Sequence, residues 1–128
     1  MARILTVEDD DDVRGLIVAH LGKAGHKVVA AASPAEAFAI VAERGAPEVV
    51  VLDVGLPEMN GLDLLVELRR RVNDDALPAI FLSARVQEHD IEAGRALGAA
   101  YLTKPFIAAA LVSAVERAVR VQEPESGW

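Results

Sequence analysis

Short apolar stretches alternate along this chain with longer segments of helical periodicity. The stretches expected to form strands are residues 3–7, 27–31, 48–52, 78–82 and 101–103. In the third of them, residues 49–52 are apolar without alternation, a pattern typical of a central parallel strand covered on both faces. Strands that alternate with helices through short connections predict an α/β fold. We expect a single doubly wound (βα)5 domain with a five-stranded parallel sheet.

The segments between the strands carry apolar residues at helical spacing. Ser33-Pro34-Ala35-Glu36 predicts a helix start, because serine and glutamate form a capping box and proline suits the first turn. The segment 87–97 contains Gly94 and is the least regular of the expected helices. The residues expected on the inner faces of the other helices are Val13, Leu16, Ile17 and Leu21; Phe38, Val41 and Ala42; Leu62, Leu65, Leu68 and Val72; and Ile107, Leu111, Ala114, Val115 and Ala118.

The composition suits one folded domain without thiol chemistry. With 128 residues, the chain can bury about two-thirds of its unfolded surface. It has no cysteine, which excludes disulfides and zinc–thiolate sites. No apolar run approaches the roughly 20 residues of a membrane span, and Met1-Ala2-Arg3 leads straight into strand-like sequence without a signal peptide. These features predict a cytoplasmic protein.

The domain is expected to span residues 1–121. Residues 122–128 have the composition of a tail or of the start of a linker. The chain is interpreted either as a stand-alone domain or as one cut from a larger protein.

The formal net charge of −7 argues against non-specific binding to nucleic acid or to an anionic membrane. The only basic run is Arg69-Arg70-Arg71, at the expected end of a helix. Interaction with the helix dipole is the main interpretation of this run, and a basic patch is the alternative.

Polar groups follow four of the predicted strands, at the point where each strand ends. They are Glu8 and Asp9 after the first strand, Asp53 after the third, Ser83 after the fourth and Lys104 after the fifth. The second strand ends in alanines, and an edge position suits a strand that contributes nothing. This favours the strand order 2-1-3-4-5. Because ligands of open α/β sheets bind at the carboxyl ends where strand order reverses, these groups are expected to form one site.

The chemistry of this set suits a divalent cation and a phosphoryl group. Two carboxylates about 4 Å apart repel by roughly 4 kcal/mol at an effective dielectric of 20, unless a cation joins them. Mg²⁺ suits carboxylates together with phosphate oxygens. Asp53 is then placed to attack phosphorus and form an acyl phosphate, while Lys104 and Ser83 bind phosphoryl oxygens.

Plainer interpretations exist for several of these residues. Asp10, Asp11 and Asp12 are expected to be an acidic start of a helix, where carboxylates are favourable, and this interpretation stays open for Glu8 and Asp9. A serine that follows a strand, such as Ser83, is usually a turn former.

These segments resemble the receiver domains of response regulators in two-component signalling, which have the flavodoxin-like fold of the chemotaxis regulators. The acidic start of that family is matched by Ile4-Leu5-Thr6-Val7-Glu8-Asp9-Asp10. Its phosphoacceptor segment is matched by Asp53-Val54-Gly55-Leu56-Pro57-Glu58-Met59-Asn60-Gly61. Its switch hydroxyl is matched by Leu82-Ser83-Ala84, and its aromatic switch position and lysine by Tyr101-Leu102-Thr103-Lys104-Pro105-Phe106. The resemblance covers residues 3–121.

The resemblance implies a role for each site residue. Asp53 is the phosphorylation site, and Asp9 is a direct Mg²⁺ ligand. Glu8 holds the ion through water, and the backbone carbonyl of Gly55 completes the protein ligands. Mn²⁺ is an alternative metal. A cis peptide bond after Lys104 would aim this side chain inward.

The resemblance also implies how the signal leaves the site. Ser83 moves toward the phosphoryl group and Tyr101 turns inward, which changes the surface formed by the fourth helix, fifth strand and fifth helix. An ordinary half-buried strand aromatic is the alternative interpretation of Tyr101.

The implied phosphodonor is a sensor histidine kinase or a histidine phosphotransfer protein. The implied downstream partner is an effector protein or an output domain of the same polypeptide. A dimer through the helix–strand–helix surface is a further expectation, whereas direct binding to nucleic acid or to a membrane is not expected. Such a protein catalyses its own aspartyl phosphorylation and dephosphorylation but is primarily a signalling module.

Other functions fit the sequence less well. A flavin-binding protein of this topology would place a phosphate next to the acidic residues 8–12, which would repel it. A phosphohydrolase with an aspartate nucleophile usually needs a carboxylate where this chain has Gly55. A pseudo-receiver that only docks partners is the remaining alternative.

A few residues near the site have roles that the sequence leaves open. Gly55 and Arg85 are expected to influence the lifetime of the phosphorylated form, in a direction that the sequence does not give.

His20, His26 and His89 are expected at the surface or on helix flanks, and none of them resembles a phosphodonor histidine.

Overall fold

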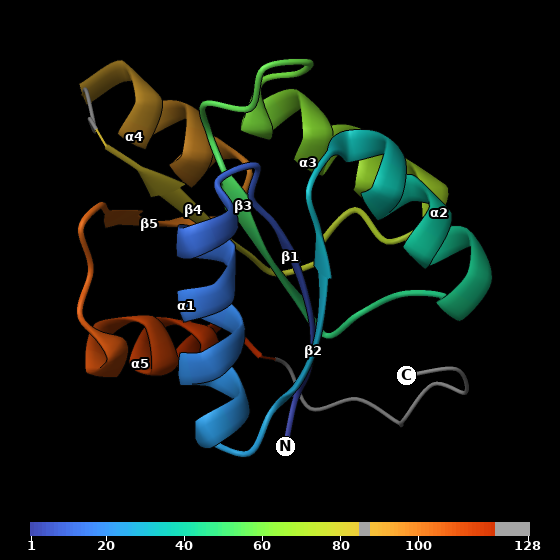
Figure 1. The fold of residues 1–128 in the computed structure, drawn as a ribbon. Coiled ribbons are helices and arrows are strands. Elements are labelled where there is room, and N and C mark those ends of the chain that lie inside the picture. The colour runs from blue at the N-terminus through green and yellow to red at the C-terminus, as the bar shows by residue number, and fades with distance from the viewer. Residues whose placement is uncertain (85–87, 120–128) are drawn as a thin grey trace.

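The computed structural model describes residues 1–84 and 88–119, which form five parallel strands and five helices. The strands are β1 (Arg3–Val7), β2 (Lys27–Ala31), β3 (Val49–Asp53), β4 (Ala79–Ser83) and β5 (Ala100–Thr103). The helices are α1 (Asp11–Lys23), α2 (Pro34–Arg44), α3 (Gly61–Arg71), α4 (Glu88–Ala96) and α5 (Ala108–Ala118). The sheet order is β2-β1-β3-β4-β5, with parallel pairing throughout (Figure 1). The predicted fold class and strand order are therefore confirmed.

Several sequence-based predictions lie outside the described residues or side chains. These are the role of Arg85, the start of the fourth helix at residue 87, the surface position of His89, the end of the domain at residue 121 and the tail at residues 122–128. Within the described ranges, no helix is both long enough and apolar enough to cross a membrane.

Helices cover both faces of the sheet, and each face has its own apolar core. On one face, α1 and α5 pack against the sheet through residues such as Ile17 and Leu111. On the other face, α2 and α3 pack through residues such as Val41 and Leu65, and Leu97 joins this cluster after α4. Figure 1 shows α1 and α5 together on one side of the sheet, with α2 and α3 on the opposite side. Every residue of β1, β3 and β4 is buried, which explains the unbroken apolar run at residues 49–52 of β3.

Two central strands end one residue later than the sequence pattern predicted. β3 includes Asp53, which pairs with Leu82, and β4 includes Ser83, which pairs with Thr103. Each of these polar residues is therefore the last member of a buried ladder, so the sheet itself sets its backbone position.

Some predicted helix faces are wrong in detail. Leu16 is 51% exposed and Ala42 is exposed, because each lies next to a buried residue and so about 100° around the helix from it. Ile107 is 71% exposed, because it is the extended N-cap residue of α5 and not part of the helix face. On α3, Leu64 is fully buried, although the sequence pattern did not select it.

Side-chain caps fix the starts of α1 and α2. The Ser33 hydroxyl accepts the N–H of Glu36 at 3.2 Å, which confirms the predicted start of α2. The Glu36 carboxylate accepts the N–H of Ala32 and not that of Ser33, one residue away from the usual capping box. Asp10 caps α1, where its carboxylate accepts two backbone N–H groups. The interpretation of Asp10 as part of an acidic helix start is confirmed.

The basic run at the end of α3 is divided among separate partners. Arg69 is 8% exposed, and its Nε and Nη2 donate to the carbonyl of Leu77 at 3.2 and 2.8 Å. Arg70 and Arg71 pair with Glu67, one turn earlier on the same helix. Arg69 therefore ties α3 to the connection before β4, and the run is not a basic patch.

Candidate functional site

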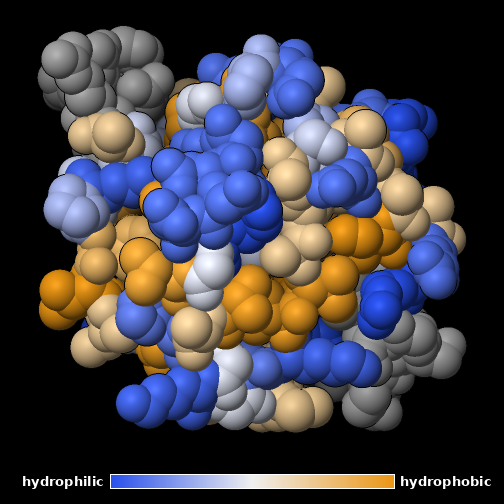
Figure 2. Space-filling model, viewed as in Figure 1, coloured by the Kyte–Doolittle hydropathy of each residue, from blue (hydrophilic) through white to orange (hydrophobic). Residues whose placement is uncertain are grey.

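The carboxyl ends of the strands bring the predicted site residues to one edge of the sheet. Glu8 and Asp9 follow β1, Asp53 and Ser83 end β3 and β4, and Lys104 follows β5. Carboxylate oxygens of Glu8, Asp9 and Asp53 lie within 4.8 Å of one another. Glu8 and Asp53 are buried, whereas Asp9 is exposed, so solvent reaches the cluster from the side of Asp9. Figure 2 shows hydrophilic residues gathered over the β1–α1 connection, above a band of apolar residues.

Lys104 places a positive charge between two of these carboxylates. Its Nζ lies 2.5 Å from Oε1 of Glu8 and 3.5 Å from Oδ1 of Asp53. The backbone N–H of Lys104 donates to the carbonyl of Ser83 at 2.8 Å, which links the end of β5 to that of β4. The peptide bond between Lys104 and Pro105 is cis, as the family resemblance implied.

Burial and charge act against each other on the ionisable groups. The pKa of Glu8 is raised, chiefly by burial, although hydrogen bonds from Lys104 and the N–H of Asp10 lower it. The charge of Asp53 raises the pKa of Glu8 further. Burial alone would lower the pKa of Lys104, but the hydrogen bonds to Glu8 and Asp53 and the charges of these two carboxylates together outweigh it and raise that pKa. One ammonium does not neutralise the carboxylates, so the site favours a second cation.

The cluster fits a divalent cation such as Mg²⁺. The separation of the oxygens, up to 4.8 Å, is close to the roughly 4 Å between opposite ligands of an octahedral Mg²⁺. The Lys104 ammonium shows that Glu8 and Asp53 can hold a positive charge between them. The exposed position of Asp9 leaves one side of the cluster open to water or phosphate oxygens. These acidic residues could therefore hold a metal ion.

The connection between β3 and α3 fixes the backbone around Asp53. Gly55 donates its N–H to Oδ1 of Asp53 at 3.1 Å, and the N–H of Gly61 donates to the carbonyl of Val54 at 3.0 Å. A Cβ built on Gly61 would lie 2.6 Å from the carbonyl oxygen of Asp53. Glycine at position 61 therefore lets α3 begin directly against the backbone of Asp53.

The two predicted switch residues lie on neighbouring strands but at different distances from the carboxyl edge of the sheet. Ser83 is 9% exposed and is at the carboxyl end of β4. Tyr101 is half-buried on β5 and pairs with Phe81, with ring centroids 5.2 Å apart. Since strand side chains alternate, Phe81 and Ser83 point to the same face of the sheet. Tyr101 thus lies one step back from the carboxylates, on the α4 side.

Two residues contribute contacts that the sequence interpretation missed. Arg14 on α1 donates from Nη1 to the carbonyl of Glu8 at 2.9 Å, which stabilises the turn that carries the carboxylates. His26 flanks α1 as expected, but its side chain is only 7% exposed: Nδ1 accepts the N–H of Ala2, and Nε2 lies 3.0 Å from a Glu116 oxygen. Both partners of His26 are distant from it in sequence, and no local pattern signals them.

A parallel sheet of this order places the clustered carboxylates and the lysine at its carboxyl edge, where open α/β domains bind their ligands. The family model of the response regulator receiver domain matches residues 4–116. The chain therefore belongs to this family, and it is a receiver domain of two-component signalling.

Individual relatives agree with this family. The chain is 38% identical to the transcriptional regulatory protein PrrA of Mycobacterium tuberculosis over 119 residues. This aligned segment covers 92% of this chain and 50% of PrrA. It is 35% identical to the response regulator SaeR of Staphylococcus aureus over 107 residues. This aligned segment covers 83% of this chain and 45% of SaeR. The chain thus spans about half the length of the curated relatives that it matches.

The fold has similar solved structures. The chemotaxis protein CheY4 of Vibrio cholerae superposes with a TM-score of 0.85 at 28% identity, covering 93% of this chain and 99% of that chain. NtrX from Brucella abortus matches with a TM-score of 0.76 at 33% identity, over 91% of this chain and 26% of that chain. The fold of the whole described domain is therefore that of a chemotaxis-type receiver.

Proposed function

We propose that this domain accepts a phosphoryl group on Asp53 in a Mg²⁺-dependent reaction. The observation that carries the proposal is the joint position of Asp53 and Lys104, whose charged atoms lie 3.5 Å apart at the carboxyl edge of the sheet. Glu8 and Asp9 bring two further carboxylates to the same place. Membership of the receiver family supports the assignment.

Four residues would hold the metal ion. Asp9 and Asp53 would bind Mg²⁺, or Mn²⁺ in its place, through their carboxylates, and Glu8 through water. The backbone carbonyl of Gly55 would complete the protein ligands. When bound, the ion would supply positive charge that offsets the negative charge of Asp53 and of the phosphoryl group.

The residues of the chain provide the rest of the chemistry. A carboxylate oxygen of Asp53 forms the new bond to phosphorus, while the P–N bond of a phosphohistidine donor breaks and its electron pair stays on the imidazole. Lys104 turns from Glu8 toward a phosphoryl oxygen, and the hydroxyl of Ser83 donates to another. Positioning and charge neutralisation supply most of the catalysis in such a transfer.

The phosphodonor is a sensor histidine kinase or a histidine phosphotransfer protein, and the surface beside the site suits its docking. Leu16 on α1 is 51% exposed, and Ile107 at the start of α5 is 71% exposed. A groove lies between the last turn of α1 and the first turn of α5, with Ala108 and Val112 in its wall. A donor whose contact surface is apolar would bury these side chains while its histidine reaches Asp53.

The output of the site is a change in the surface formed by α4, β5 and α5. Ser83 and Tyr101 respond to the phosphoryl group, and this surface then binds an effector protein, an output domain of the same polypeptide or a second copy of the chain. We assign this receiver to residues 1–121 and its action to the cytoplasm, as for two-component signalling proteins in general.

The test is intact mass spectrometry after incubation with acetyl phosphate. We expect one added phosphoryl group in the presence of Mg²⁺, none after chelation and none in Asp53→Asn. Asp12→Asn changes an exposed carboxylate on α1 and serves as the matched control that still accepts the group. No adduct in the unaltered protein, even in trapping experiments with short incubation, would favour a pseudo-receiver that only docks partners.

A further inference from the structure

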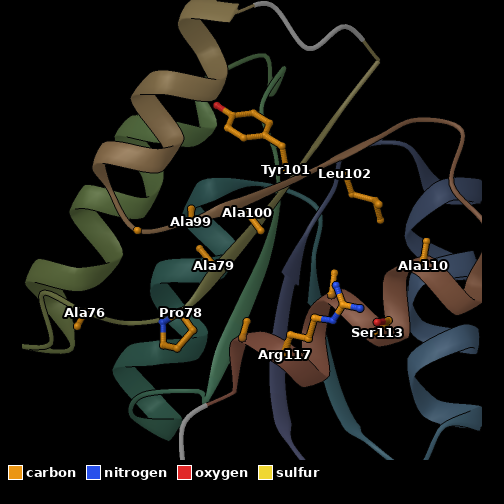
Figure 3. A pocket seen from close by; sticks show the side chains of 13 residues that line it. Ala76, Pro78, Ala79, Ala99, Ala100, Tyr101, Leu102, Ala110, Ser113 and Arg117 are labelled. Atoms are coloured by element: carbon orange, nitrogen blue, oxygen red, sulfur yellow. The ribbon is translucent and has the colours of Figure 1, made fainter.

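Gly94, near the carboxyl end of α4, lies directly against the ring of Tyr101. A Cβ built on Gly94 would lie 2.1 Å from Cε2 of Tyr101, 3.0 Å from Cδ2 and 3.1 Å from Cζ. Non-bonded carbon atoms do not approach to 2.1 Å, so the ring occupies the space that a side chain at position 94 would need. Figure 3 shows the ring reaching from β5 toward α4, while the other labelled side chains lie below it around a groove beside β5 and α5.

The other helical glycines do not share this property. For Gly15 and Gly22 in α1, no atom of the described residues lies within 4 Å of a built Cβ. A Cβ on Gly61 would meet the backbone of the β3–α3 connection. Among the helical glycines that the structure describes, Gly94 is therefore the one whose missing side chain is replaced by an aromatic ring.

The end of α4 is tied to the start of β5, so the helix cannot easily move away from the ring. The carbonyl of Gly94 accepts the N–H of Ala99 at 2.9 Å, and the carbonyl of Arg95 accepts the N–H of Gly98 at 3.0 Å. With Gly98 at φ +72°, these bonds form a Schellman motif. Tyr101 follows this corner by two residues. Rotation of the Tyr101 side chain would relieve a clash at position 94 more easily than a shift of α4.

The opposite contact of the ring lies in the core. Phe81 on β4 has its ring centroid 5.2 Å from that of Tyr101, at an interplanar angle of 39°. The Tyr101 ring is thus held between Phe81 and the backbone of Gly94. Leaving this position means losing both contacts at once.

We propose that Gly94 is a positioning residue that sets the orientation of Tyr101 and, through it, the switching equilibrium of the α4–β5 surface. This inference rests on the proposed function, in which Tyr101 changes orientation after phosphorylation. A side chain at position 94 would fill the space between Phe81 and the backbone of Gly94 that the Tyr101 ring occupies, which we call the seat of the ring. The ring then leaves α4 before any phosphoryl group is added.

The test uses the single tyrosine of the chain as a probe. Incorporation of 3-fluorotyrosine reports Tyr101 alone, by ¹⁹F NMR, in the unaltered protein, Gly94→Ala and Gly15→Ala. In Gly94→Ala without a phosphoryl group, we expect the population of the seated ring to fall at least about tenfold. Gly15→Ala should leave the spectrum unchanged. An unchanged Tyr101 resonance in folded Gly94→Ala would overturn the proposal.

A stability comparison keeps the test decisive if Gly94→Ala folds poorly. In the unaltered background, Gly94→Ala should lower the urea midpoint. In a Tyr101→Ala background the seat is empty, and the same change should leave the midpoint unchanged or raise it, because alanine is the better helix former. Equal effects in the two backgrounds would contradict the contact between Gly94 and the ring.

A third arm separates this inference from the proposed function. Mg²⁺ with beryllofluoride, a phosphoryl analogue, should shift the Tyr101 resonance of the unaltered protein toward that of Gly94→Ala. No shift would overturn the link between the seat and switching and would count against the proposed switch itself. A failure of Asp53 to accept a phosphoryl group would instead contradict the proposed function. The ¹⁹F comparison of the unaltered protein with Gly94→Ala, both without a phosphoryl group, would still test whether Gly94 sets the orientation of Tyr101.

Discussion

Replacing Gly61 with alanine should destabilise the domain and disturb Asp53. The new Cβ would lie 2.6 Å from the carbonyl oxygen of Asp53 and 2.9 Å from Cα of Val54. These separations are roughly 1 Å short of ordinary packing distance, and both contacted atoms belong to the backbone. The N–H of Gly61 is bonded to the carbonyl of Val54 at 3.0 Å, so α3 cannot move outward without breaking this bond.

The size of the effect follows from overpacking. Such overpacking costs about 1–3 kcal/mol, and the gain in helix propensity from glycine to alanine offsets at most about 1 kcal/mol. We expect a net loss of about 2 kcal/mol in the free energy of unfolding, which corresponds to a fall of roughly 5–10 °C in Tm. The rate of phosphorylation by acetyl phosphate should fall as well, because the displaced backbone carries Asp53.

Urea unfolding followed by far-UV circular dichroism measures this change. Gly15→Ala is the matched control, since no described atom lies within 4 Å of its built Cβ. The control should gain up to about 1 kcal/mol in stability. If both variants shifted the midpoint in the same direction by the same amount, the steric argument at position 61 would be refuted.

Three further predictions concern stability and ionisation. Arg69→Ala removes two hydrogen bonds to a buried carbonyl and should cost about 2 kcal/mol in urea unfolding, so an unchanged midpoint would show that this arginine is dispensable. Ser33→Ala removes the N-cap of α2 and should cost about 1 kcal/mol, whereas no loss would mean that Glu36 alone fixes this helix start. Hydrogen bonds from Arg70 and Arg71 lower the pKa of Glu67 to about 2, so its stabilising effect is present above pH 4.5 and is lost as the pH falls toward 2. A ¹³C NMR titration of the Glu67 carboxyl with a midpoint near 4.5 would contradict these ion pairs.

The alternation of strands and helices could be predicted because each burial pattern follows from local sequence. The central strand β3 appears as an unbroken apolar run at residues 49–52, and the absence of a polar group at the end of the second strand suggested its edge position. The inner faces of helices were harder to predict. Leu16 and Ala42 lie beside buried residues, and a periodic pattern does not separate the edge of an apolar face from its centre.

The contacts that the sequence could not provide join side chains to backbone groups. Arg69 binds the carbonyl of Leu77, Arg14 binds that of Glu8, and His26 accepts the N–H of Ala2. A carbonyl or N–H group is present at nearly every residue, so nothing in the side-chain pattern marks which one is the partner. Gly94 is a similar case. The sequence marks it only as an irregularity in a helix, whereas in the structure the ring of Tyr101 lies against it.

The most direct test of the proposed phosphorylation mechanism is the position of the phosphoryl group. The protein is incubated with acetyl phosphate and Mg²⁺, the acyl phosphate is reduced with borohydride, and peptide masses then locate the reduced side chain. We predict modification at Asp53 alone. Modification at Glu8 or Asp9, or a phosphoryl group on Ser83 with Asp53 unmodified, would contradict the assignment of Asp53 as the acceptor.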